Sequence, residues 1–495
     1  MSEIRVTYSG FIAFVIGMIS VISGLIVTII ITRSLTSLEF GTWTLITNLI
    51  GFIIILEPII SYWATREIAR KTESGTTAVI TNGVFSCVAI LIYIVILLIV
   101  ATQTDASFDI MLYAIILVPV IFVNRTLTAV ILGFKPHIAS YGALTYGLIQ
   151  IPAILFFLYY LELGVVGVIL SSFSGYSISA LVLFIFGRER LHRNFNLNFI
   201  KKWFKLSWLT LYPATFGFVS LMDITIFSII TGSVIGLSYW GAAMVVPIII
   251  TQAAGISYAI YPKILGSGKN DFLRNNFSLL FYFAIPLAAI SITFAQPALF
   301  TLNPIYVIAL PVVIITSVFV FFNMLNTTFY SALLGKETVD VDEKSTFKDY
   351  LKSKLFHLPT ILLIQYLIYI PALAIGIVMG IANKFSEIEL VILWSVIALI
   401  THSPFTFYFY YLIKRDLSVS LDYFRIAKFL VLSIFSFGIS YLLIENYLDY
   451  EIDFIYFILT VIGILLIGVG SYIALTFATD LKTRELFNAL IHKKI

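Results

Sequence analysis

Apolar residues occur in long runs along this chain, and short polar segments separate the runs. Each run is about 20 residues long, the length of helix that crosses about 30 Å of hydrocarbon. The pattern therefore predicts an all-α, polytopic membrane protein with fourteen transmembrane helices. The predicted spans are residues 8–32, 42–62, 78–100, 110–132, 141–161, 165–187, 207–230, 237–261, 277–295, 306–333, 359–382, 388–413, 427–444 and 454–478.

The composition agrees with this prediction, since 60% of the residues are hydrophobic and only 11% are charged. A soluble protein has about 25% charged residues because its surface must face water. The first apolar run, 8–32, is longer than the signal-peptide core of about 7–15 residues, so we expect it to be a membrane span. One cysteine, Cys87, excludes an intramolecular disulfide and a cysteine-based metal cluster.

Positive charge predicts the orientation in the cell membrane. All but three of the 30 Lys and Arg residues lie either in every second segment that connects two spans or at one of the two ends of the chain. Because cytoplasmic loops are rich in Lys and Arg, both termini are predicted to be cytoplasmic. The exceptions are Arg33 and Lys384 in outer loops and Arg125 inside a span. The net charge of +4 therefore reports membrane orientation and not a nucleic-acid partner.

Short sequence matches recur in the same order in two blocks of six spans, which predicts an internal repeat. Six spans are an even number, so the two copies run in the same direction, related by an axis along the membrane normal. We predict two six-helix bundles, plus two extra C-terminal helices. Residues 124–133 match 326–335, 151–153 match 370–372, 168–172 match 391–395, and 61–62 match 257–258. The predicted domains are an N-terminal lobe, a cytoplasmic linker, a second lobe, and helices 13–14 with the tail, over residues 1–187, 188–206, 207–413 and 414–495.

Two local motifs suggest a family. Residues 32–41 read T-R-S-L-T-S-L-E-F-G, and Asp223 precedes T-G-S-V-I-G-L at 231–237. With Y-P-K at 261–263, they resemble Wzx-type polysaccharide flippases of the multidrug/oligosaccharidyl-lipid/polysaccharide exporter superfamily. In this chain Ser238 stands where those proteins usually have Tyr, and the loop 336–358 is longer and more charged than theirs.

The resemblance implies a function. Such proteins move polyprenyl-(pyro)phosphate-linked oligosaccharides across the cell membrane by alternating access of two lobes, for surface polysaccharide or glycoprotein glycan synthesis. It implies a cationic, aromatic-lined cavity for the headgroup, with the lipid tail beside helices 13 and 14. The expected partners are the lipid-linked oligosaccharide and membrane lipid, with a proton or sodium ion and glycan-assembly enzymes as further candidates.

Three charged residues lie well inside predicted spans, away from the span ends: Arg125, Glu57 and Asp223. A charge at the centre of the bilayer costs about 2.5–3.5 kcal/mol on insertion scales, so it normally faces a cavity or a partner. Arg125 is the leading candidate to bind the phosphate or pyrophosphate bidentately. The alternative is that Arg125 extends to the inner surface or pairs with a carboxylate such as Glu57. Glu57 and Asp223 either bind a coupling ion or act as a gate, or they form structural contacts between helices.

Five further residues complete the predicted substrate site. Arg33 at the outer mouth and Arg66 at the inner mouth could steer an anionic headgroup, although Arg66 also fits an ordinary cytoplasmic anchor. Asn124, Gln252 and Asn326 could donate hydrogen bonds to sugars, or could simply hold helices together.

Two other classes of protein remain as alternatives. A cation-coupled multidrug or metabolite exporter of the same fold is the first. The second is a membrane glycan ligase or polymerase, for which the acidic cluster Asp449, Glu451 and Asp453 is the only candidate site. Short outer loops and the lack of a P-loop or a paired catalytic motif argue against an enzyme, and no cofactor or metal is predicted. The amphipathic stretches 199–205 and 347–355 are predicted to lie on the inner leaflet.

Overall fold

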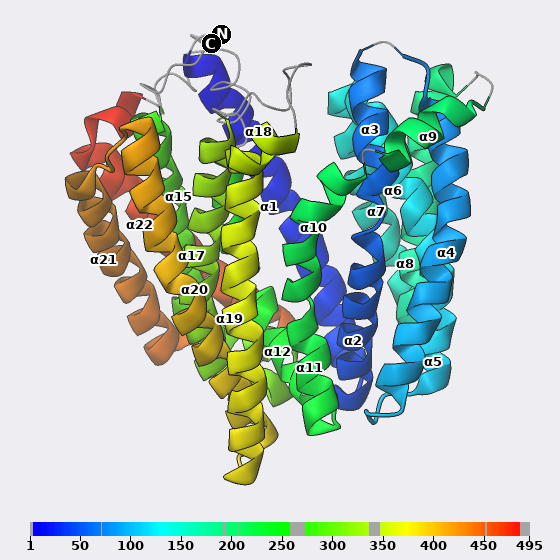
Figure 1. Cartoon of the computed structure of the whole chain (residues 1–495). Coiled ribbons are helices and arrows are strands. Elements are labelled where there is room, and N and C mark those ends of the chain that lie inside the picture. Colours follow the sequence, from blue (N-terminus) through cyan, green and yellow to red (C-terminus); the bar gives the residue numbers. More distant parts are fainter. Residues whose placement is uncertain are drawn as a thin grey trace. The chain divides into compact units, whose positions relative to one another are not determined.

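The computed structural model describes residues 3–70, 72–191, 195–205, 207–257, 273–335, 347–450 and 453–485. All regular elements among these residues are helices (Figure 1). In the described part of the chain, twelve helical segments are long and apolar enough to cross a membrane, and one bent pair would supply a thirteenth. Each predicted span overlaps a helix. A total of fourteen crossings and the side on which the termini lie both stay predictions. Residues 261–263, Glu451 and residues 336–346 of the loop 336–358 lie outside the described residues.

The chain forms two compact units. The N-terminal unit comprises Ile22–Gly241 and Pro359–Trp394, and the C-terminal unit comprises Met1–Val21, Ala242–Leu358 and Ser395–Ile495. These units group helices by their packing and do not follow the lobe boundaries that the repeat predicts, so the lobes stay a prediction.

The helices of the N-terminal unit are α2 (Ser37–Ile54), α3 (Pro58–Ala69), α4 (Gly75–Ala101), α5 (Phe108–Tyr113), α6 (Leu117–Phe134), α7 (Pro136–Ile154), α8 (Gly164–Gly187), α9 (Leu197–Lys205), α10 (Trp208–Ser220), α11 (Met222–Thr231), most of α12 (Ile235–Val245) and most of α19 (Lys354–Ala382). Those of the C-terminal unit are α13 (Ile248–Thr251), α15 (Leu273–Thr293), α16 (Ala295–Leu302), α17 (Leu310–Leu334), α18 (Phe347–Lys352), most of α20 (Glu387–Leu417), α21 (Tyr423–Tyr447) and α22 (Phe454–Thr479). Helix α1 (Glu3–Ser34) contributes to both.

Helix α6 is central to the N-terminal unit, where it packs against α3, α4 and α8 (Figure 1). Small residues permit this close packing. A Cβ atom at Gly133 would lie 2.6 Å from the carbonyl oxygen of Thr65 on α3, and one at Gly175 would lie 3.0 Å from the Tyr146 ring.

The second predicted span, 42–62, is not one continuous helix. Helix α2 ends at Ile54 and α3 begins at Pro58. Proline has no N–H for an intrahelical hydrogen bond, and it is well tolerated at the first position of a new helix. The break places Glu57 at the N-terminus of α3.

The seventh predicted span, 207–230, is also broken, at Leu221 between α10 and α11. The side chain of Asn48 on α2 supports this break. Its Nδ2 donates to the Leu221 carbonyl at 3.0 Å, and its Oδ1 accepts from the Thr225 hydroxyl at 2.9 Å. Asn48 thereby satisfies polar groups that a continuous helix would have paired internally.

Helix α9, predicted to lie on the membrane surface, is packed against protein. Trp203 is fully buried in a cluster with Ile60 and Ala64 of α3 and Ala78 of α4. Lys202 forms an ion pair with Glu67 of α3, with 2.9 Å between Nζ and Oε1. The apolar face of α9 therefore covers the ends of α3 and α4.

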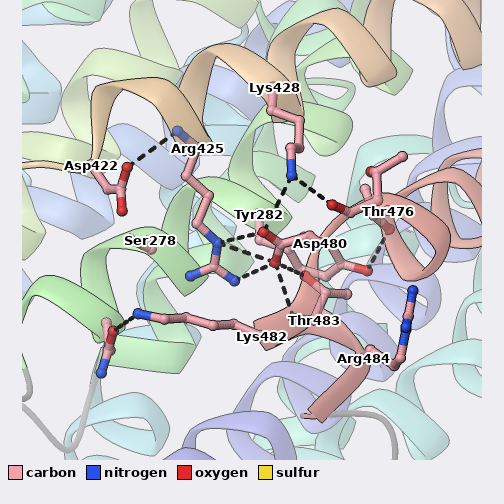
Figure 2. Close-up of polar contacts among 12 residues, drawn as sticks. Ser278, Tyr282, Asp422, Arg425, Lys428, Thr476, Asp480, Lys482, Thr483 and Arg484 are labelled. Carbon is pink, nitrogen blue, oxygen red and sulfur yellow. Dashed lines mark hydrogen bonds and ion pairs between the residues drawn. The ribbon is translucent and has the colours of Figure 1, made fainter.

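In the C-terminal unit, α21 packs between α15 and α22. The ends of these helices are joined by polar contacts (Figure 2). The hydroxyl of Tyr472 donates to the Tyr282 carbonyl at 2.9 Å. Asp480, just beyond α22, binds Arg425 of α21, with 2.7 Å between Nη2 and Oδ2. Burial alone would raise the pKa of Asp480, but the hydrogen bonds from Arg425 and Thr483 lower it to about 2.

Candidate functional site

A buried polar cluster surrounds Glu57 at the break between α2 and α3. The Glu57 side chain is 3% exposed. Its Oε2 accepts a hydrogen bond from Ser61 at 2.9 Å, and its Oε1 accepts one from Asn82 Nδ2 of α4 at 3.0 Å. Asn82 also donates to Thr126 of α6 at 2.5 Å. The Glu57 carboxyl thus joins α3 to α4, and Asn82 extends the network to α6.

Arg125 lies beside this cluster, one residue before Thr126, but its side chain is exposed. It exerts an electrostatic effect on both Glu57 and Tyr176. No ion pair joins Arg125 to Glu57, and among the described residues the guanidinium has no hydrogen-bond partner. The predicted alternative of an Arg125–Glu57 salt bridge is therefore not formed in this conformation.

Two tyrosines lie on the helices next to Arg125. The rings of Tyr146 on α7 and Tyr176 on α8 are 4.4 Å apart. Asn124, predicted to bind sugar, is buried and donates from Nδ2 to Ser179 of α8 at 2.8 Å. The Ser179 hydroxyl in turn donates to the Gly142 carbonyl at 2.8 Å. Asn124 thus holds α6, α7 and α8 together through hydrogen bonds. Arg125, the next residue on α6, makes no hydrogen bond to a described residue.

The two motifs that suggested the family contact each other. A Cβ atom at Gly41, the last residue of the first motif, would collide with the carbonyl of Val234 in the second. Asp105, between α4 and α5, reinforces this contact. Its Oδ1 accepts from Val234 N at 2.8 Å, and its own N–H donates to the Gly232 carbonyl at 3.1 Å. Gly232 has φ of 70°, a conformation that favours glycine.

Asp223 is the centre of a second polar network, at the start of α11. Its Oδ2 accepts from the Tyr369 hydroxyl of α19 at 3.1 Å, and that hydroxyl accepts from Trp394 Nε1 at 2.6 Å. The Trp394 ring is stacked between Trp240, at 3.9 Å, and Phe227, at 4.9 Å. Asp223 is not near a described cation, so a salt bridge does not explain its position.

The remaining predicted residues are not gathered at one point. Arg33 is exposed at the end of α1, and the Arg66 guanidinium lies 4.7 Å from the centre of the Tyr62 ring. Gln252 is half-buried after α13 and donates to its neighbour Thr251 at 3.3 Å. The predicted site as a whole therefore stays a prediction.

Asn326 differs from its repeat partner Asn124. It is 3% exposed on α17, and neither its amide oxygen nor its amide nitrogen has a hydrogen-bond partner among the described residues. Nearby on α17, Phe319 contacts His402 and Phe322 contacts Phe407, both of α20. Asn326 thus lies on a helix that contacts α20 partly through aromatic rings.

Sequence reasoning missed four residues that build these networks: Asn48, Asn82, Asp105 and Tyr369. Asn48 and Asn82 are amides inside predicted spans, so the criterion that selected Asn124 and Asn326 would have found them. Asp105 and Tyr369 carry no such signal, because only the folded chain brings them to Val234 and Asp223. Among the described residues, no group of three or more His, Cys, Asp or Glu is placed to bind a metal.

Comparison with known proteins identifies the fold. No protein-family model and no curated protein matches the sequence. Among solved structures, one described as the lipid II flippase MurJ in an inward closed conformation is similar, with 14% identity and a TM-score of 0.68. The match covers 96% of this chain and 100% of that one.

Transporter structures of the MATE family are also similar. One is described as an inward-facing multidrug resistance MATE transporter of the MOP superfamily, with 13% identity, a TM-score of 0.58, and coverage of 83% of this chain and 100% of that one. An outward-facing one has 15% identity, a TM-score of 0.56, and coverage of 85% and 98%. The chain is thus a multi-pass, all-helical membrane protein with the fold that these flippase and transporter structures share.

Proposed function

We propose that the chain is a flippase that moves a polyprenyl-(pyro)phosphate-linked oligosaccharide across the cell membrane by alternating access. The observation that carries this proposal is Arg125, an exposed guanidinium inside an apolar span with no described hydrogen-bond partner. An arginine exposed to hydrocarbon is costly, so Arg125 is better placed facing water or an anionic ligand. The planar guanidinium can donate two parallel hydrogen bonds to one phosphate group.

The neighbours of Arg125 suit a lipid-linked glycan. Glu57 is held by Ser61 and Asn82, so the arginine is not neutralised by direct contact. Tyr176 and Tyr146 offer rings on which sugars could stack. In this proposal Glu57 and Asp223 respond to a coupling proton or sodium ion, and Arg33 and Arg66 attract the headgroup at the two mouths.

The contact between Gly41 and Val234 supports alternating access. It joins the first predicted outer hairpin to the hairpin between the seventh and eighth spans, which belong to different predicted lobes. We assign it the role of an outer gate that is closed in this conformation. A side chain at position 41 would prevent closure, because the obstacle is a backbone carbonyl.

A multidrug or metabolite exporter is the second candidate, because MATE transporters share the fold. The flippase structure covers more of this chain, 96% against 83–85%, which favours the flippase.

The proposal is tested by measuring leaflet exposure of a fluorescent lipid-linked oligosaccharide in proteoliposomes. We expect protein-dependent exposure that falls at least tenfold for Arg125→Ala, as expected for loss of about 1.5–3 kcal/mol of charge-assisted hydrogen bonding. Arg125→Lys keeps the positive charge but loses the paired donors of the guanidinium, so it should retain part of the activity.

Two outcomes would count against this account. Unchanged exposure for Arg125→Ala would remove the phosphate-binding role of Arg125 but keep the flippase. No exposure by folded protein, with several glycans and imposed ion gradients, combined with efflux of cationic dyes, would favour the exporter.

A further inference from the structure

Helix α2 contacts the seventh and eighth predicted spans at several points along its length (Figure 1). Small residues on both sides permit the approach. A Cβ atom at Gly51 of α2 would lie 3.1 Å from Leu221 Cδ1, and one at Gly241 of α12 would lie 2.9 Å from the Thr44 hydroxyl oxygen. The internal repeat assigns span 2 to one predicted lobe and spans 7 and 8 to the other. Alternating access therefore requires this contact to open and close.

Asn48 is a polar residue in the middle of the contact, about 10 Å along α2 from Gly41. Its side chain is 4% exposed, and both ends of its amide are used. Nδ2 donates to the Leu221 carbonyl at 3.0 Å, and Oδ1 accepts from the Thr225 hydroxyl at 2.9 Å. Both partners belong to span 7. The amide of Asn48 thus joins two different spans through two hydrogen bonds.

Val234 lies at the end of the same contact that includes Gly41. It is fully buried, and its N–H donates to Asp105 Oδ1 at 2.8 Å. Its carbonyl faces Gly41 so closely that a Cβ atom there would collide with it. Separation of span 2 from spans 7 and 8 would expose Val234 and break both hydrogen bonds of Asn48.

The bonds of Asn48 matter because apolar packing alone favours the closed contact only weakly in a membrane. Lipid tails are as apolar as leucine, so close packing and hydrogen bonds must supply the preference of one helix for another. A hydrogen bond between membrane helices changes an equilibrium constant about threefold on average, so the two bonds together should favour the closed contact about tenfold.

We infer that Asn48 holds the outer gate closed and sets the equilibrium between its closed and open states. Asn48 is a positioning residue in this account, acting through the separation of span 2 from span 7. The inference rests on alternating access in the proposed function and is independent of which substrate the chain carries.

The test measures how fast a soluble maleimide labels a single cysteine at position 234 in the purified full-length protein. Val234→Cys is combined with Cys87→Ser, which removes the one native thiol. Because Val234 is fully buried, labelling requires opening, and its rate follows the population of the open state. Asn48→Leu should raise the rate about tenfold, and Thr225→Val, which removes one bond, about threefold. Thr225→Val should add nothing to Asn48→Leu, because the bond is already absent.

Ser179→Ala is the matched control. It also removes two hydrogen bonds between helices, those to Asn124 and to the Gly142 carbonyl, but all these residues belong to one predicted lobe. The control should leave the labelling rate unchanged. An equal rise in the control would show a general loosening of the protein and would overturn the inference. Unchanged rates in both Asn48→Leu and Thr225→Val would overturn it as well.

Two further comparisons keep the result decisive. If Asn48→Leu does not fold, Thr225→Val decides alone, since valine has nearly the shape of threonine and lacks only the hydroxyl donor. The leaflet-exposure assay on the same proteins separates this inference from the proposed substrate. The expected labelling rates without any exposure of lipid-linked oligosaccharide would support the role of Asn48 and contradict only the substrate.

Discussion

Close packing between neighbouring helices involves different residue types in the two units. In the N-terminal unit, glycine and serine let α6, α7 and α8 approach closely, and Asn124, Ser179 and the Gly142 carbonyl form a chain of hydrogen bonds. In the C-terminal unit, aromatic rings supply many of the contacts of α17 with α15 and α20, beside a hydrogen bond between Ser291 and Ser317. Phe329 of α17 contacts Phe277 at 5.4 Å and Tyr410 at 6.1 Å. A hydrogen bond needs a narrow range of distance and angle, whereas a pair of rings accepts either an offset-stacked or an edge-to-face arrangement.

The largest expected effect is loss of a ring from the C-terminal unit. Phe329 is 1% exposed, so Phe329→Ala should leave a cavity and cost about 3–5 kcal/mol of unfolding free energy. Thermal unfolding in detergent measures this. Tyr411→Ala removes an aromatic side chain that is 55% exposed on α20 and should cost much less. Equal losses would mean that Phe329 is not a packing centre.

Adding volume should harm the N-terminal unit. The Cβ of Gly175→Leu would lie 3.0 Å from the Tyr146 ring, so we expect a loss of about 1–3 kcal/mol from overpacking. Gly438→Leu on α21 is the matched control, because nothing lies within 4 Å of its added Cβ. A neutral Gly175→Leu would show that α7 and α8 can separate at little cost.

The two repeat-related asparagines should respond in opposite ways. Asn124→Leu breaks the bond to Ser179 and should cost about 1 kcal/mol, as interhelical hydrogen bonds in membranes do. Asn326→Leu removes two buried polar atoms without described partners, so stability should be unchanged or higher. A clear loss for Asn326→Leu would reveal a partner that this conformation does not show.

The smallest effect is a pH dependence confined to the C-terminal unit. The pKa of Asp480 is lowered from 3.8 to about 2 in the folded chain. Its stabilising contact with Arg425 is therefore fully present above about pH 4 and is lost as the pH falls towards 2. Asp480→Asn should remove this part of the acid sensitivity in thermal unfolding scans, while Asp453→Asn, at the start of α22, should not.

Sequence patterning predicted the helical segments because burial in lipid demands long apolar runs, whatever the tertiary contacts. It also selected Glu57 and Asp223, since each is a charge inside such a run. It did not predict the breaks at 55–57 and Leu221. The first depends on Pro58 starting a new helix, and the second on Asn48, which lies far away in sequence and satisfies the free carbonyl.

The other differences between prediction and structure concern which partner each buried polar side chain contacts in the folded chain. Charge alone predicts a salt bridge between Arg125 and Glu57. In the folded chain the neutral side chains of Ser61 and Asn82 instead donate hydrogen bonds to the Glu57 carboxylate, at 2.9 and 3.0 Å. Asn124 and Asn326 are equivalent in sequence but not in surroundings, because the helix that faces each one differs. Hydrophobic periodicity does not encode such pairings.

The stack of Trp394 on Trp240 gives this protein an intrinsic optical signal. Their ring planes are nearly parallel, at 6°, with centroids 3.9 Å apart, so their electronic transitions should couple and produce a near-ultraviolet circular dichroism band. Only six tryptophans are present in the chain, which keeps the background low. Because Trp394 also binds the hydroxyl that contacts Asp223, that band should report rearrangements at this carboxylate without any attached dye.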